Sequence, residues 1–147
     1  HRIRYRLHKG DRWRSCLAKG EFVLRLTFLP LIVRIAIAAA VLTVLALASL
    51  EPSLAPPSAH NADLWLHGAA YGGLTFILVA LFARPVFCAL TALAISGALE
   101  GLQDRVPGRS ANWEDAMANA AGVALAYIAL LCLRRYLAAR APGRNPN

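Results

Sequence analysis

The chain has 147 residues, a hydrophobic fraction of 58% and a formal net charge of +8. This length fits one domain, but soluble domains are only about 45–50% apolar. A water-soluble domain of this size would leave much apolar surface exposed. The composition therefore excludes an ordinary soluble domain and favours a membrane protein.

The positive charge lies beside apolar segments and not on one compact surface. Clusters of Lys and Arg precede the first apolar segment, separate the second from the third and follow the last. This distribution is typical of a topology signal and of contact with anionic headgroups. No nucleic-acid-binding motif accompanies it, which argues against nucleic acid as a partner.

Residues 1–29 form a basic segment, which we expect to be a cytoplasmic tail lying against anionic lipid. The next 20 residues, from Leu31 to Leu50, contain a single charge, Arg34. A helix of that length spans roughly 30 Å, the thickness of the hydrocarbon core. A secretory signal peptide is the alternative, but the apolar run is long and no clear cleavage site follows it.

The second apolar span is expected from about Ala62 to Phe82, with Asn61 as its N-cap. Asp63, His67 and Tyr71 recur every four residues and so form one polar stripe. Gly68 and Gly72 lie close to the same stripe and permit close approach of another helix. That helix could belong to this chain or to a second copy, as in a homodimer.

Two further spans are expected, at about residues 85–103 and 113–133. A very short turn at residues 83–85 makes the second and third spans antiparallel neighbours. Asn112 is a candidate N-cap of the fourth span, with Asp115 as its capping-box partner. Both spans carry polar residues at helical spacing, namely Ser96, Glu100 and Gln103 in the third and Asp115 and Asn119 in the fourth.

The predicted fold is an all-α membrane protein, a bundle of four transmembrane helices over residues 30–134, followed by a basic, frayed cytoplasmic tail over residues 135–147. Of 16 Lys and Arg residues, only Arg105 and Arg109 fall on the side of the first and third connections, which leaves 14 on the other side. The positive-inside rule then places both termini in the cytoplasm. The three cysteines, at positions 16, 88 and 132, lack metal-ligand spacing and are expected to be free thiols.

This topology brings the polar residues of three helices to the extracytoplasmic end. Because ionisable groups are costly in a membrane, they indicate a functional site. The candidate catalytic residues are Glu100, His67 and Asp115, and the candidate ligand-binding residues are Asp63, Tyr71, Gln103, Arg109 and Asn119.

Structural roles are the alternative for several of these residues. Asp63 and Asp115 could stabilise helix N-termini, Asn119 could join two helices, and Tyr71 could be a packing aromatic. Glu100 needs a partner, and Arg109 or His67 is the expected one.

The same residues resemble the VanZ-like membrane proteins. The pattern is H-x3-Y in the second span, at His67 and Tyr71, followed by E-x2-Q-x5-R-x5-D-x3-N-x2-G from Glu100 to Gly122. The resemblance covers roughly residues 31–133, and one departure is Leu64, where a basic residue is expected. It implies a multi-pass protein of the bacterial cytoplasmic (inner) membrane, linked to resistance to the glycopeptide teicoplanin.

Three functions follow as hypotheses, and enzymatic activity stays open among them. The first is a site that binds or modifies an anionic envelope lipid, such as a polyprenyl-phosphate-linked precursor, through Arg109 and a helix N-terminus. The second is a metal-dependent enzyme using Asp63, His67, Glu100 and Asp115. It is disfavoured because no known metal-binding spacing appears, so no metal or other cofactor is expected. The third is an interaction or transporter-like protein whose polar cluster is structural.

Overall fold

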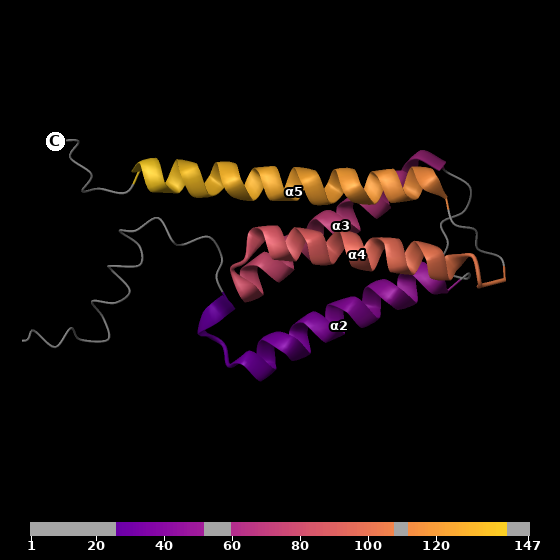
Figure 1. Cartoon of the computed structure of the whole chain (residues 1–147), viewed down its shortest axis with the longest axis horizontal. Helices are drawn as coiled ribbons and strands as arrows, with labels where there is room; N and C mark the ends of the chain where they lie inside the picture. Colours follow the sequence, from indigo (N-terminus) through magenta and orange to yellow (C-terminus); the bar gives the residue numbers. More distant parts are fainter. Residues whose placement is uncertain (1–25, 52–59, 108–111, 141–147) are drawn as a thin grey trace, which may run out of the picture. The chain divides into compact units, whose positions relative to one another are not determined.

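The computed structural model describes residues 26–51, 60–107 and 112–140, and all its regular elements in these ranges are helical. A short 3-10 helix, η1 (Leu26–Phe28), precedes four long α-helices (Figure 1). These are α2 (Leu31–Leu50), α3 (His60–Phe82), α4 (Pro85–Gln103) and α5 (Trp113–Arg140). Each of the four is long and apolar enough to cross a membrane. The protein is therefore an all-α, multi-pass membrane protein, as its sequence predicts.

Two compact units make up the chain. One is Arg25–Leu130, which holds α2, α3, α4 and most of α5, and the other contains the end of α5 from Leu131. Every interhelical contact described below lies within the unit Arg25–Leu130. The predicted tail at residues 1–29 lies mostly outside the described residues, as do residues 141–147.

Six of the eight predicted ends of the long helices agree with the structure. Helix α3 begins at His60 and not after Asn61, so Asn61 lies inside the helix and the predicted N-cap is wrong. Helix α5 continues to Arg140, so residues 134–140 are helical and not frayed. Alanine, leucine and arginine favour helix in this segment, and the guanidinium of Arg140 lies 4.6 Å from the ring centroid of Tyr136.

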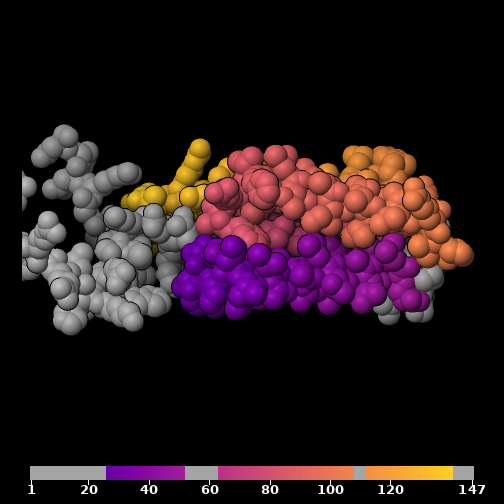
Figure 2. All heavy atoms as spheres, turned by 60° about the horizontal axis from the view of Figure 1, so that its bottom comes forward, coloured from indigo at the N-terminus to yellow at the C-terminus, as the bar shows by residue number. Residues whose placement is uncertain are grey.

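Helices α3 and α4 form an antiparallel pair joined by a two-residue connection. Ala83 in this connection has a φ of 57°, and its N–H donates to the carbonyl of Val79, which ends α3 in a left-handed cap. Helix α2 contacts both α3 and α4, and Figure 2 shows it lying along α4. Only Ala38 of α2 is buried, so most of this helix is left to face lipid.

Glycines allow α3 and α5 to touch backbone to backbone. A Cβ atom added at Gly72 would lie 3.1 Å from the carbonyl oxygen of Gly122, and one at Gly68 would lie 3.3 Å from that of Ala118. A Cβ at Gly122 would overlap the backbone of Gly68, at 2.7 Å from its carbonyl carbon. The glycines that could have served a homodimer therefore contact α5 of the same chain. A homodimer stays a prediction and would use another surface.

Arg34 joins α2 to the end of α3. Its Nη1 donates to the carbonyl of Leu81 at 3.1 Å, and its guanidinium lies 6.0 Å from the ring centroid of Phe82. Leu81 is in the last turn of α3, where carbonyls lack helical partners and a positive charge is favourable. Arg34 of α2 therefore caps a neighbouring helix.

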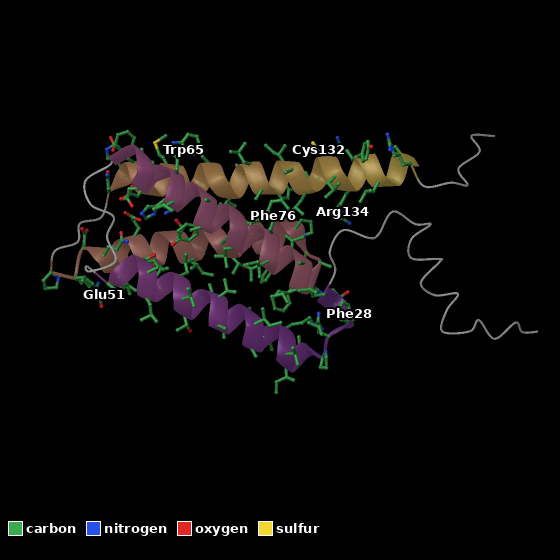
Figure 3. All side chains as sticks on the ribbon, turned by 180° about the vertical axis from the view of Figure 1, so that it is seen from behind. Phe28, Glu51, Trp65, Phe76, Cys132 and Arg134 are labelled. Atoms are coloured by element: carbon green, nitrogen blue, oxygen red, sulfur yellow. The ribbon has the colours of Figure 1, made fainter. Side chains whose placement is uncertain are left out.

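Large apolar side chains cover the outside of the bundle. Trp65 is 80% exposed and Trp113 is 70% exposed, near the starts of α3 and α5. Phe28 is also exposed and lies at the opposite end from Trp65 and Glu51 (Figure 3). Aromatic residues near both helix ends are typical of the two membrane–water interfaces.

Gly122→Ala is expected to destabilise the protein by about 1–3 kcal/mol, because the new methyl group overlaps the backbone of Gly68. Thermal unfolding in detergent would measure this as a lower midpoint. Gly97→Ala is the matched control, since a Cβ at Gly97 meets no atom within 4 Å. Equal losses in the two variants would contradict the close contact between α3 and α5.

Candidate functional site

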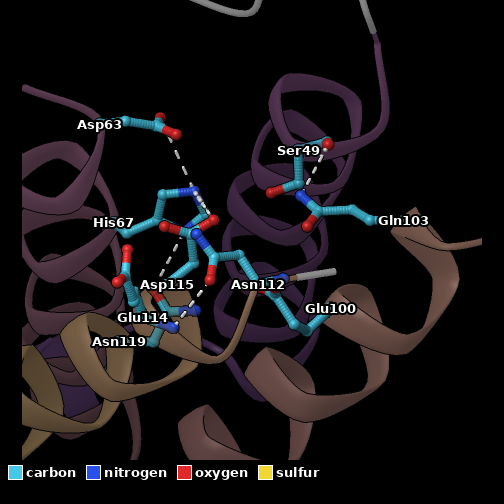
Figure 4. Close-up of polar contacts among 9 residues, drawn as sticks. All are labelled: Ser49, Asp63, His67, Glu100, Gln103, Asn112, Glu114, Asp115 and Asn119. Carbon is cyan, nitrogen blue, oxygen red and sulfur yellow. Dashed lines mark hydrogen bonds and ion pairs between the residues drawn. The ribbon is translucent and has the colours of Figure 1, made fainter. Parts of the chain in front are cut away.

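Polar side chains gather at the end of the bundle where α2 and α4 finish and α3 and α5 begin, here called the polar end (Figure 4). The helices alternate in direction along the chain, so residues late in α4 meet residues early in α3 and α5. The predicted meeting of these residues is confirmed by their contacts. They form two sets, one around His67 and one around Glu100.

The imidazole of His67 is the centre of the first set. Its Nδ1 lies 3.1 Å from Oδ1 of Asn119, while its Nε2 lies 3.8 Å from Asp63 and 3.9 Å from Asp115. We call these four residues the His67 cluster. Asp63 and His67 share one face of α3, and Asp115 and Asn119 share one face of α5, because residues four apart in a helix are neighbours.

The two carboxylates stand further from His67 than a hydrogen bond allows. Hydrogen bonds to nitrogen are about 2.7–3.2 Å long, so at 3.8 and 3.9 Å neither carboxylate is hydrogen-bonded to Nε2. The side chains of His67 and Asp115 are 13% and 12% exposed, whereas that of Asp63 is 34% exposed. Asp63 is thus the member of the cluster that is most open to a ligand.

Asn119 fixes the orientation of the imidazole through its contact with Nδ1. Its side chain is fully buried, and its Oδ1 can only accept, so Nδ1 of His67 carries the proton in this contact. In neutral His67 the lone pair is then on Nε2, which faces the carboxylates. The Nδ2 atom of Asn119 has no hydrogen-bond partner among the described residues.

Glu100, the centre of the second set, caps α5 from another helix. Its Oε1 accepts a hydrogen bond from the backbone N–H of Asn112 at 2.8 Å. Asn112 is the N-cap that its sequence predicts, because its Oδ1 accepts from the N–H of Glu114 at 3.1 Å. The expectation that Asp115 completes a capping box is wrong, since Glu100 of α4 accepts that hydrogen bond. Asp115 contacts His67 instead.

Of the two partners expected for Glu100, His67 is not the one that it contacts, and Arg109 lies outside the described residues. His67 is occupied by Asn119, Asp63 and Asp115, and the hydrogen-bond partner of Glu100 in the described chain is Asn112. Glu100 is buried, where a carboxylate without a partner would be costly. A backbone N–H at a helix N-terminus is a favourable partner for this charge.

Gln103 and Tyr71 connect the polar end to α2. The Nε2 of Gln103 donates to the carbonyl of Ser49 at 2.9 Å, in the last turn of α2, where carbonyls lack helical partners. The hydroxyl of the buried Tyr71 hydrogen-bonds with the side chains of Ser49 and Ser96 and lies within electrostatic range of Glu100. Both predicted ligand residues therefore make contacts within the bundle.

Of the eight predicted site residues, four form the His67 cluster and three line the side toward α2 and α4. The eighth, Arg109, lies outside the described residues. Sequence reasoning missed the part taken by Ser49 and by the backbone of Asn112. The presence of a serine in the last turn of an apolar span was the available signal for the first.

The His67 cluster also contains a potential set of metal ligands. Asp63, His67 and Asp115 each offer one ligand atom, and these atoms lie within 4.8 Å of one another. The sequence suggests these residues together with Glu100 as metal ligands but disfavours the site, because ligand motifs are recognised by local spacing and no known spacing appears. Here two ligands are on α3 and the third is on α5, and the fold alone brings them together.

Comparison with known proteins adds no family to this geometry. The chain matches no protein-family model, and searches of curated proteins and of solved structures find no significant match either. Its function must therefore be argued from the polar end itself.

Removing the carboxylate of Glu100 should destabilise the start of α5. Glu100→Ala leaves the N–H of Asn112 without this acceptor, at an expected cost of about 1–3 kcal/mol. Glu100→Gln keeps an acceptor oxygen and should lose less. Thermal unfolding in detergent would compare the two, and an unchanged midpoint in Glu100→Ala would contradict the role of Glu100 as a cap.

Proposed function

We propose that this chain is a VanZ-like protein of the bacterial cytoplasmic (inner) membrane. Its polar end would bind, or act on, an anionic envelope lipid or lipid-linked cell-wall precursor at the outer leaflet. The resemblance in sequence supports the family, and the positive-inside rule supports the orientation. A link to teicoplanin resistance follows from the family and is part of the proposal.

The observation that carries the proposal is the His67 cluster itself. Two carboxylates and an imidazole from separate helices approach one another within about one or two helical turns of the end of a membrane bundle. Ionisable groups at this depth are expensive and are generally kept for function. Because Asp63 stays partly exposed, the headgroup of a lipid could reach the cluster without entering the core.

An anionic ligand requires positive charge at the polar end. The N-terminus of α5 supplies the positive end of its helix dipole, while its N–H groups at Asn112 and Glu114 are bonded within the protein. Arg109, in the preceding connection, would supply a full charge and can bind a phosphate with two parallel hydrogen bonds. Phosphate linked to a polyprenyl chain suits both features, since its chain would lie among the exposed apolar side chains of the helices.

His67 is the residue best suited to move a proton. Its Nε2 faces Asp63 and Asp115, of which Asp63 is partly exposed, and Asn119 holds the ring at Nδ1. An imidazole held in this way can act as a general base or acid toward a bound headgroup. Asp115 would orient it and stabilise its charged form.

A purely structural role is the second candidate, favoured by the contacts of Glu100 and Gln103. Both side chains cap helix ends, which accounts for them without any ligand. The whole polar end would be structural if the His67 cluster served only to hold α3 and α5 together. Binding and phenotype experiments separate the two.

Native mass spectrometry of the detergent-extracted protein with added polyprenyl phosphate would test binding. Wild type is expected to retain this lipid in preference to a zwitterionic lipid, and Arg109→Ala should lose most of the retained lipid. Arg105→Ala is the matched control, because Arg105 is an exposed residue of the same connection. Equal retention in both variants would refute the role of Arg109, and no retention by wild type would favour the structural candidate.

Expression in a susceptible bacterium is expected to raise the minimum inhibitory concentration of teicoplanin. His67→Ala should abolish this effect, since it removes the group at the centre of the cluster. Phe76→Leu on the exposed side of α3 should not. Membrane levels of each variant must be matched, and resistance that survives His67→Ala at equal levels would contradict a functional cluster.

A further inference from the structure

We propose that Asp63, His67 and Asp115 form a binding site for a divalent metal ion of the Zn²⁺ class. This site goes beyond the proposed lipid function, because it depends on the arrangement of three side chains and not on the identity of any lipid. The sequence raised these residues together with Glu100 as metal ligands but disfavoured the site for lack of a known spacing, and the fold supplies the missing geometry.

The distances between the three ligand atoms are closer to those around a bound metal ion than to the length of a hydrogen bond. In a tetrahedral zinc site with bonds of about 2.0–2.2 Å, neighbouring ligand atoms lie about 3.3–3.6 Å apart. Nε2 of His67 lies 3.8 Å and 3.9 Å from the two carboxylates, and all three ligand atoms lie within 4.8 Å of one another. Side-chain movements on the order of 1 Å would bring atoms up to 4.8 Å apart to coordination distance.

The tautomer of His67 is the second, independent observation. Metal-binding histidines generally donate the other ring N–H to a neighbouring acceptor, which fixes the ring and leaves one lone pair for the metal. Here Nδ1 contacts Oδ1 of the buried Asn119 at 3.1 Å, so the lone pair of neutral His67 is on Nε2, toward Asp63 and Asp115. Asn119 is therefore a positioning residue for the ligand set.

The remaining group of Asn119 also points to a missing acceptor. Its side chain is fully buried and directly contacts His67, yet its Nδ2 has no partner among the described residues. An unpaired buried N–H₂ group costs free energy.

The types of ligand atom favour the same occupant. Two carboxylates and one imidazole each offer a ligand atom at this point of the bundle. Mixed imidazole and carboxylate ligands suit Zn²⁺ and related transition metals, and three protein ligands leave a fourth position for an exchangeable ligand.

Zn²⁺ binding by the untagged protein in detergent, after removal of metal with a chelator, tests the site. Isothermal titration and elemental analysis are expected to show one Zn²⁺ per chain in wild type. Asp63→Asn, His67→Gln and Asp115→Asn should each abolish stoichiometric binding. Glu114→Gln is the matched control, since it neutralises the acid beside Asp115 in the first turn of α5 but leaves the three ligands intact.

Asn119 variants test the positioning role. Asn119→Leu should weaken Zn²⁺ binding by about 10–100-fold, while Asn119→Asp keeps an acceptor for Nδ1 and should restore most of the affinity. Circular dichroism and a single elution peak would verify that each variant folds. Because the wild-type measurement needs no substitution, the proposal can be tested even if the variants fail to fold.

Absence of stoichiometric Zn²⁺ in wild type would overturn the proposal. The two carboxylates would then contact His67 without a metal ion between them. Equal loss of binding in Glu114→Gln would also overturn the proposal, by showing unspecific binding to acidic groups. Lipid retention measured with chelator present is a separate readout. The lipid proposal could therefore fail while metal binding is found, or hold while it is not.

Discussion

Close approach of α3 and α5 is the constraint on which the polar end depends. Aspartate and asparagine have short side chains, so Asp115 and Asn119 can reach His67 only if the two backbones nearly touch. Gly68 follows His67 directly, and Gly122 lies one helical turn after Asn119, so the contact between these glycines sets the helix separation beside the cluster. In a membrane, where helices gain little from hydrophobic burial against each other, small residues permit the close packing that holds them together. The same glycines thus provide both association and site geometry.

Helix ends impose a second requirement, since their unpaired backbone groups need partners where water is scarce. This bundle meets it with side chains from neighbouring helices. Glu100 of α4 binds the start of α5, Gln103 of α4 binds the end of α2, and Arg34 of α2 binds the end of α3. Each contact satisfies a backbone group and also fixes the register of two helices. A charged residue in an apolar helix can therefore be structural even when its position suggests catalysis, as Glu100 illustrates.

Much of the architecture could be predicted from the sequence because apolar runs of bilayer length and their flanking charges are local signals. The gathering of the polar residues was also predictable, since helices that alternate in direction bring the end of α4 to the start of α5. The contact partners of the individual polar side chains could not be predicted. The choice of Asn112 over His67 as the partner of Glu100 depends on helix rotation, which the helical period alone leaves undetermined. The ligand set that includes Asp115 depends on the separation of α3 and α5, which the glycines permit but do not specify.

Attachment of α2 is concentrated near its two ends. Arg34 holds one end to α3, Gln103 holds the other through Ser49, and only Ala38 between them is buried. Lipid chains have no fixed shape. Side chains that face them must therefore be apolar but need little shape complementarity to their surroundings. The exposed face of α2 is thus free to drift in sequence as long as it stays apolar. Distant relatives of this protein would be recognised by α3, α4 and α5, while α2 would retain little beyond its length and the residues that anchor its ends.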